Sequence, residues 1–245
     1  RSGCASASSI FTNASARRKP RAERLPLRPG LLCLALAAPV GAADLACEGV
    51  PVTLRAGDAA TARQVCDMAR AAADELASCN LPLTEPVTLA LVDEVHDGCL
   101  GLFHCGEGLI DLVAPDRIAG NRSRAGLFAP LPDDVLFRAV LTHELTHAAY
   151  EATGACPFAA CPATDEYLAY AMTFRTLPDT LRGAVLGKSD VSAPVGRDQI
   201  SPVMALFAPD SFARTAWLHF SQRPDPCGYV GQIAAGAIVL DRERP

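Results

Sequence analysis

The stretch VLFRAVLTHELTHAAY, residues 135–150, decides the fold of the region around it. It follows two acidic residues, contains no Pro or Gly, and is closed shortly afterwards by Gly154, which together predict a helix. Within it, His143, Glu144 and His147 form the pattern His-Glu-x-x-His. Positions four apart lie on the same face of a helix, so both imidazoles can reach one metal ion. Glu144 is then placed beside the metal without binding it, as a general base that takes a proton from water.

Apolar residues surround most of the predicted helix, which is typical of a buried one. Burying two imidazoles and a carboxylate without partners costs several kcal/mol, and a metal ion would remove that penalty. The competing interpretation is a core helix whose two histidines are satisfied by neighbouring side chains.

A catalytic zinc site usually takes three protein ligands and keeps a fourth position for water. We expect Glu166 to be the third ligand. It lies near the start of a second predicted helix, which begins with Thr164 after Pro162 and continues through Phe174. Eighteen residues separate His147 from Glu166, enough for a loop that turns the chain back.

His-Glu-x-x-His followed after eighteen residues by Glu, in a helix of small residues, is similar to the gluzincin metallopeptidases. The resemblance implies Zn²⁺ held by His143, His147 and Glu166, with Glu144 as general base and a peptide or protein as substrate. It also implies a small zincin-like α+β domain, with a short sheet, an active-site helix and a following glutamate helix.

Three departures from related patterns narrow this interpretation. No Gly-Ala-Met-Glu-Asn strand is present, so aminopeptidase specificity is not expected. The metzincin pattern needs Gly at 150 and His at 153, where this chain has Tyr150 and Thr153. A deuterolysin-like arrangement would use an Asp as third ligand, and Asp165 stays open as that alternative.

The chemistry also needs a donor that stabilises the oxyanion of the transition state. We expect His219, in an amphipathic helix over residues 211–220, to be this catalytic residue, although the same helix could simply pack its aromatic residues into the core. The other candidates are tyrosines: Tyr150, Tyr167, Tyr170 and Tyr229.

The first 43 residues predict a disordered leader and a signal peptide: basic residues, an apolar run over 31–38, and small residues at 40–43. We therefore expect a secreted or periplasmic protein whose zincin-like domain spans residues 44–245, without a membrane span. A transit peptide, or a lipid anchor at Cys47, are the alternatives.

Removal of the leader leaves eight of the ten cysteines, an even number that suggests disulfides. We expect bridges between Cys156 and Cys161 and between Cys99 and Cys105. The alternative for the second pair is a zinc site that adds His96 and His104.

Without the leader, 15 basic and 26 acidic residues give a net charge of −11, which argues against nucleic-acid binding.

Strands are predicted near residues 50–55, 87–92 and 109–114, and a helix over 59–77. The resemblance to zinc peptidases implies an edge strand that pairs with extended peptide substrate, and the strand near 109–114 is the candidate for it. Two functions follow: an exported zinc peptidase, or a disulfide-linked secreted binding domain or inactive pseudopeptidase.

Overall fold

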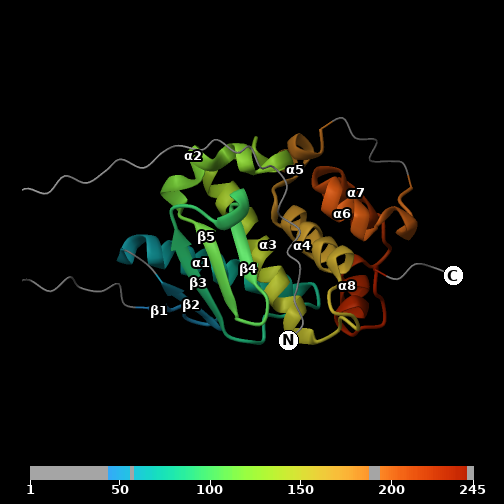
Figure 1. The fold of residues 1–245 in the computed structure, drawn as a ribbon, viewed down its shortest axis with the longest axis horizontal. Helices are drawn as coiled ribbons and strands as arrows, with labels where there is room; N and C mark the ends of the chain where they lie inside the picture. The colour runs from blue at the N-terminus through green and yellow to red at the C-terminus, as the bar shows by residue number, and fades with distance from the viewer. Residues whose placement is uncertain (1–43, 56–57, 188–193, 242–245) are drawn as a thin grey trace, which may run out of the picture.

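The computed structural model of the chain describes residues 44–55, 58–187 and 194–241, and the expected leader lies outside them. The fold is α+β, with a mixed five-stranded sheet and eight helices among the described residues. Figure 1 shows helix α3 lying between the sheet and the C-terminal helices. No helix in the described ranges is long and apolar enough to cross a membrane.

The strands are β1 (Leu45–Ala46), β2 (Val52–Arg55), β3 (Val87–Val92), β4 (Gly101–His104) and β5 (Leu109–Val113). The helices are α1 (Ala59–Ser78), α2 (Ile118–Asn121), α3 (Asp133–Thr153), α4 (Pro162–Thr176), α5 (Asp179–Leu186), α6 (Pro202–Phe207), α7 (Pro209–Ser221) and α8 (Pro226–Ala234).

The sheet has the strand order β1-β2-β3-β5-β4. Strands β2, β3 and β5 are parallel, whereas β1 and β4 run antiparallel to their neighbours at the two edges. The expectation that residues 109–114 form the edge was wrong. They form β5, which pairs with β3 on one side and with β4 on the other. The edge strand beside α3 is β4.

Helix α1 connects β2 to β3 and covers one face of the sheet. Asp58 caps it, because its carboxylate accepts hydrogen bonds from the backbone N–H groups of Ala60 and Thr61 at 3.0 and 2.9 Å. Such a cap contributes about 1 kcal/mol. The buried stripe of α1 recurs at three- and four-residue spacing and turns toward the sheet and α3.

Helices α3 and α4 pack against each other and form the centre of the molecule. Helix α3 ends where Gly154 adopts a left-handed conformation with φ of +63°, which costs glycine little. The predicted helix is confirmed, and so is the second one, although α4 begins at Pro162 rather than Thr164. Helix α4 also packs against α7 on its other side, so it is buried along most of its length.

Three disulfides lie in the described part of the chain: Cys47–Cys66, Cys79–Cys227 and Cys156–Cys161. They are consistent with an extracellular protein. The expected Cys156–Cys161 bridge is confirmed. The alternative of a lipid anchor at Cys47 is wrong, because the sulfur of Cys47 is in a disulfide.

The expected bridge between Cys99 and Cys105 is not among these three. The two cysteines flank strand β4, whose four extended residues alone span roughly 13 Å. A disulfide needs Cα atoms about 4.4–6.8 Å apart. The same separation rules out the alternative zinc site there, and His104 instead contacts Asp111, with 2.9 Å between Nε2 and Oδ2.

Candidate metal centre

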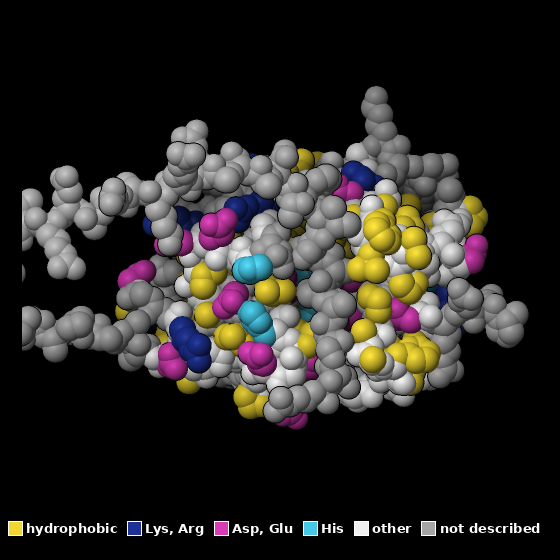
Figure 2. All heavy atoms as spheres, in the orientation of Figure 1, with side chains coloured by type: hydrophobic (Ala, Val, Ile, Leu, Met, Phe, Trp, Pro, Cys, Tyr) yellow, Lys and Arg dark blue, Asp and Glu magenta, His cyan; other side chains and the backbone are white. Residues whose placement is uncertain are grey.

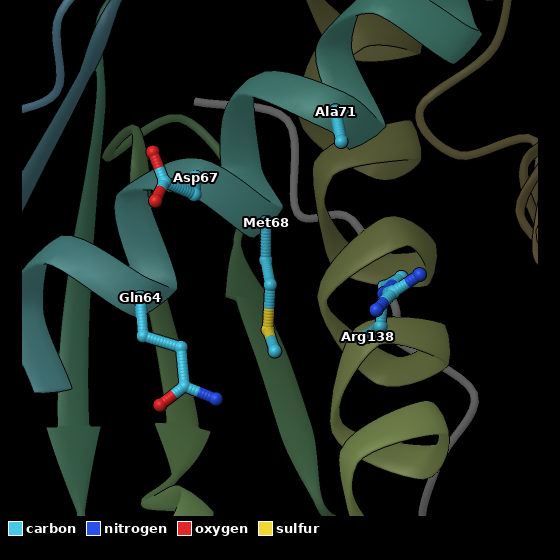
Figure 3. A pocket seen from close by; sticks show the side chains of 5 residues that line it. All are labelled: Gln64, Asp67, Met68, Ala71 and Arg138. Atoms are coloured by element: carbon cyan, nitrogen blue, oxygen red, sulfur yellow. The ribbon is translucent and has the colours of Figure 1, made fainter.

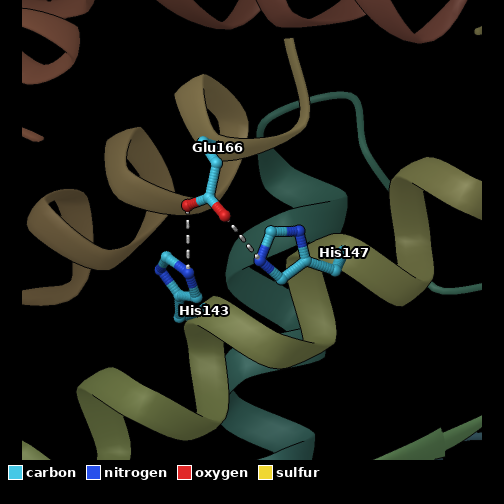
Figure 4. Close-up of side chains that lie close together, drawn as sticks. All are labelled: His143, His147 and Glu166. Atoms are coloured by element: carbon cyan, nitrogen blue, oxygen red, sulfur yellow. Dashed lines mark ion pairs between the residues drawn. The ribbon is translucent and has the colours of Figure 1, made fainter. Parts of the chain in front are cut away.

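Two histidines one turn apart on α3 and one glutamate on α4 converge on a single point (Figure 4). Nε2 of His143 lies 3.5 Å from Oε2 of Glu166, and Nε2 of His147 lies 4.0 Å from Oε1 of the same carboxylate. One candidate ligand atom from each residue lies within 4.8 Å of the other two. Metal–ligand bonds of about 2 Å let one ion touch atoms spaced in this way after small adjustments. The three predicted ligands are therefore brought together and can hold a metal ion.

Asp165 orients His147 and is not part of the ligand set. Its Oδ1 lies 2.7 Å from Nδ1 of His147, whereas Glu166 faces Nε2 of the same ring. A hydrogen bond there fixes the tautomer and leaves Nε2 for a metal. Burial lowers the pKa of His147, but the carboxylates of Asp165, Glu166 and Glu144 outweigh burial and raise it to about 10. The structure does not bring Asp165, the alternative third ligand, into the group of candidate ligands, because its carboxylate contacts Nδ1 of His147 whereas Glu166 faces Nε2.

Glu144 is buried beside the ligands but is not one of them. Its Oε2 accepts a hydrogen bond from the backbone N–H of Phe103 in β4, at 2.9 Å. Burial raises the pKa of Glu144, an effect that the nearby imidazoles of His143 and His147 oppose and Glu166 reinforces. The carboxylate is thus held in place by the edge strand of the sheet.

Gly101 makes this close approach of β4 to α3 feasible. A Cβ at this position would lie 2.7 Å from Cγ and 2.8 Å from Oε1 of Glu144, and 2.8 Å from Cγ1 of Val140. Real Cβ atoms do not come this close to other atoms, so any larger residue would displace the helix, the strand or the glutamate.

A cleft of about 690 Å³ opens beside the cluster and is lined by His143, Glu144 and Tyr170 together with mostly apolar residues. On its α6 side, Leu206 and Phe207 contribute to the wall, and the side chain of Phe207 is 71% exposed. Figure 2 shows apolar side chains gathered over the region of α6 and α7. A second hollow, between α1 and α3, contains none of the metal-ligand candidates (Figure 3).

Tyr170 is the tyrosine that the structure brings to the cluster. Its ring centroid lies 4.8 Å from that of His143. Burial, with the carboxylates of Glu166, Asp210 and Glu144 nearby, raises the pKa of Tyr170 well above its usual value. Its hydroxyl therefore keeps a proton to donate. The sequence placed Tyr170 among five candidates but offered no signal that favoured it.

The structure does not bring His219 to the cluster. This buried side chain does not line the cleft; its Nδ1 lies 3.0 Å from the hydroxyl of Tyr167, and its Nε2 contacts Arg223. Its ring also packs against Tyr229. Burial and the positive charges of Arg223 and Arg197 lower the pKa of His219 to about 4. Tyr167 follows Glu166 on α4 and points elsewhere, so the helix that packs on it carries His219 away from the metal ligands.

The comparisons with known proteins give one family match. A family model described as a family of unknown function (DUF6639) matches residues 52–243, which include the whole cluster and the cleft. No curated protein and no solved structure matches the chain.

Proposed function

The chain belongs to the family of unknown function DUF6639, so its activity has to be inferred from the site, and we propose that it is an exported zinc-dependent peptidase of gluzincin type. The observation that carries the proposal is the convergence of His143, His147 and Glu166, with the carboxylate of Glu144 buried beside them. Two imidazoles and one carboxylate are a common ligand set for catalytic zinc.

The residues around the cluster fit a bound cation. Glu144, Asp165 and Glu166 place three carboxylates around two imidazoles in a largely buried site. A divalent cation would compensate this negative charge, and the nitrogen and oxygen donors suit zinc. The carboxylate on Nδ1 of His147 is the usual outer partner of a metal-binding histidine.

The elements around the cluster support a zincin-like arrangement. A short sheet presents an antiparallel edge strand, β4, beside α3, and α4 follows with the third ligand. An edge strand offers backbone N–H and C=O groups with which an extended peptide can pair. The cleft beside β4 and α3 would receive the substrate.

Zinc, when bound, supplies a Lewis acid that polarises the scissile carbonyl and lowers the pKa of a water molecule. Glu144 would take the proton from that water and later deliver it to the leaving amine. The hydrogen bond from Phe103 holds the carboxylate in position. Tyr170, protonated and beside His143, donates a hydrogen bond to the developing oxyanion.

Zinc stoichiometry measured by elemental analysis tests the site, with His147→Ala and Glu144→Gln beside the wild type. We expect one zinc per chain in the wild type and in Glu144→Gln, whose amide oxygen can still accept the hydrogen bond of Phe103, and none in His147→Ala. His104→Ala is the matched control, because this histidine pairs with Asp111 outside the cluster, and it should keep the zinc.

Cleavage of a degenerate peptide pool, followed by mass spectrometry, tests the activity. Glu144→Gln should lower the rate by about 10²–10⁴-fold while it keeps its zinc. A folded wild type without zinc would contradict the metal site. A zinc-loaded wild type that cleaves no peptide would favour the binding domain or pseudopeptidase instead.

A further inference from the structure

The cleft contains an arginine whose hydrogen-bonding capacity is only partly used. Arg124 lies in the short 3-10 turn Arg122–Arg124, before α3, and lines the cleft that also contains His143 and Glu144. Its Nη2 donates to Oε1 of Glu94 at 2.5 Å. Its Nη1 is buried and has no hydrogen-bond partner among the described residues.

The two acidic residues that line the same cleft, Glu144 and Asp210, have other partners than this arginine, and Glu144 accepts from the backbone N–H of Phe103. Asp210, in the first turn of α7, accepts a hydrogen bond from the backbone N–H of Leu127 at 3.1 Å. The partner that Arg124 does have, Glu94, is an exposed side chain at 67%. One nitrogen of the guanidinium is therefore paired with the exposed Glu94, and Nη1 is buried without a partner, while the side chain as a whole is 27% exposed and lines the cleft.

A guanidinium is suited to carboxylates because its donors form a planar fork that binds both oxygens. A buried donor without a partner is unfavourable, and a ligand that supplies an acceptor removes that cost. Among the described residues that line the cleft, Arg124 is the only Arg or Lys, beside the carboxylates of Glu144 and Asp210 and a mostly apolar remainder, so it is the group there that can recognise an anion.

We propose that Arg124 binds a carboxylate of the peptide that enters the cleft, an inference that rests on the proposed peptidase function and narrows its substrate class. The carboxylate is either the C-terminal group of the peptide or an Asp or Glu side chain. Both have the same chemistry toward the guanidinium, and the experiment separates them.

Binding is measured on zinc-loaded protein carrying Glu144→Gln, so that peptides are not consumed. Three N-acetylated pentapeptide pools are compared by equilibrium dialysis and mass spectrometry: one with a free C-terminus, one amidated, and one amidated with Glu at one position. The first two contain no Asp or Glu elsewhere. We expect a carboxylate-bearing pool to be retained at least about tenfold more than the neutral amidated pool. Which of the two is preferred identifies the source.

The variant Arg124→Met in the same background should abolish this preference. Arg117→Met is the matched control, because it removes the same charge from an exposed arginine that pairs with Asp93 and does not line the cleft. A preference that is absent, or that survives Arg124→Met, overturns the proposal. Thermal unfolding and zinc content establish that each variant is folded.

Glu94→Ala provides a second test that does not depend on a replacement inside the cleft. It removes the acceptor of Nη2 of Arg124, so this nitrogen becomes available, and the carboxylate preference should rise severalfold. An unchanged or lower preference in folded Glu94→Ala protein counts against the assignment. Cleavage of the pools by the wild type is read separately, so that failure of the peptidase function and failure of carboxylate binding give different results.

Discussion

Replacement of Gly101, like that of Glu144, should separate the proposed catalysis from metal binding. In Gly101→Ala the new methyl group would collide with Glu144 and Val140, so we expect the carboxylate to move. The hydrolysis rate should fall at least about tenfold and stability by about 1–3 kcal/mol, with zinc content unchanged. Gly120→Ala is the control, because a Cβ there meets nothing within 4 Å. Wild-type activity in Gly101→Ala would show that the contact with Glu144 is not needed.

Replacement of Asp165 should weaken zinc binding rather than act directly on the chemical step. Asp165→Asn keeps an acceptor for Nδ1 of His147 but removes the negative charge, so zinc affinity should fall about 10- to 100-fold in competition with a chelator. Asp134→Asn, an exposed acidic residue in the first turn of α3, should leave the affinity near the wild-type value. Equal affinities in the two variants would contradict the orienting role.

The grouping of the candidate ligands could be predicted from the sequence, because the spacing of His143 and His147 places both side chains on one face of any helix. Glu166 could be predicted from its place near the start of the next helix. The roles of Asp165, Tyr170 and His219 could not, because they depend on the rotation of α4 about its own axis and on the helix that packs behind it. Packing against elements that are distant in sequence decides both the rotation of α4 and the position of the helix behind it.

Helix α4 begins at a cap supplied from the far end of the chain. The carboxylate of Asp241 accepts hydrogen bonds from the backbone N–H groups of Ala163 and Thr164, at 2.8 and 3.0 Å, and from the Thr164 hydroxyl at 2.6 Å. The next two residues of α4 are Asp165 and Glu166. The C-terminal segment thereby fixes the turn that presents the third ligand.

We expect Asp241→Ala to lower the free energy of unfolding by about 1–2 kcal/mol and also to weaken zinc binding. Asp225→Ala is the matched control: Asp225 caps α8 through the N–H of Gly228 at 2.8 Å, but α8 carries no ligand. It should cost similar stability without a change in zinc affinity. Urea unfolding and chelator competition measure the two effects. Zinc binding that falls equally in both variants would mean that the capping of α4 has no special role.

Among the elements, those with a strong local pattern could be predicted. Helix α1 has its cap and apolar stripe, and β3 was expected at the residues it occupies. The sequence does not predict strand β4, because Gly101 and His104 give its four residues no clear strand pattern. Without β4, the sequence predicts β5 at the edge of the sheet. Short helices such as α6 and α8 were also missed, because tertiary packing rather than local pattern stabilises them.

The stability of the whole molecule should depend on pH through His219. Its pKa is about 4 in the folded protein and 6.5 in an unfolded chain, so the unfolded state binds more protons between these values. Above pH 6.5 its contribution is fully present, and as pH falls toward 4 up to about 3 kcal/mol is lost. The positive neighbours Arg223 and Arg197 oppose protonation, and Tyr167 and Tyr229 enclose the ring.

Urea unfolding of wild type and His219→Gln at a series of pH values from 7 to 4 measures this dependence. The wild-type curve should fall more steeply than that of the variant, which lacks the titrating group. Parallel curves would show that His219 is not the source of the acid sensitivity.

The presence of disulfides in the molecule could be predicted from its composition. The cysteine count suggested disulfides, and three are present among the described residues. The pairing could not be predicted beyond Cys156–Cys161, because the other two bridges join residues whose proximity arises only from the folded topology.

The bridge between Cys79 and Cys227 closes a covalent ring across a sequence separation of 148 residues, and both helices of the metal cluster lie on that ring. A single backbone cut by a protease anywhere between these cysteines opens the ring but releases no fragment. Such a nicked molecule would migrate as one species on a denaturing gel until a thiol reductant is added. The ring thus gives the protein a tolerance to proteolytic damage that the uncrosslinked chain would lack.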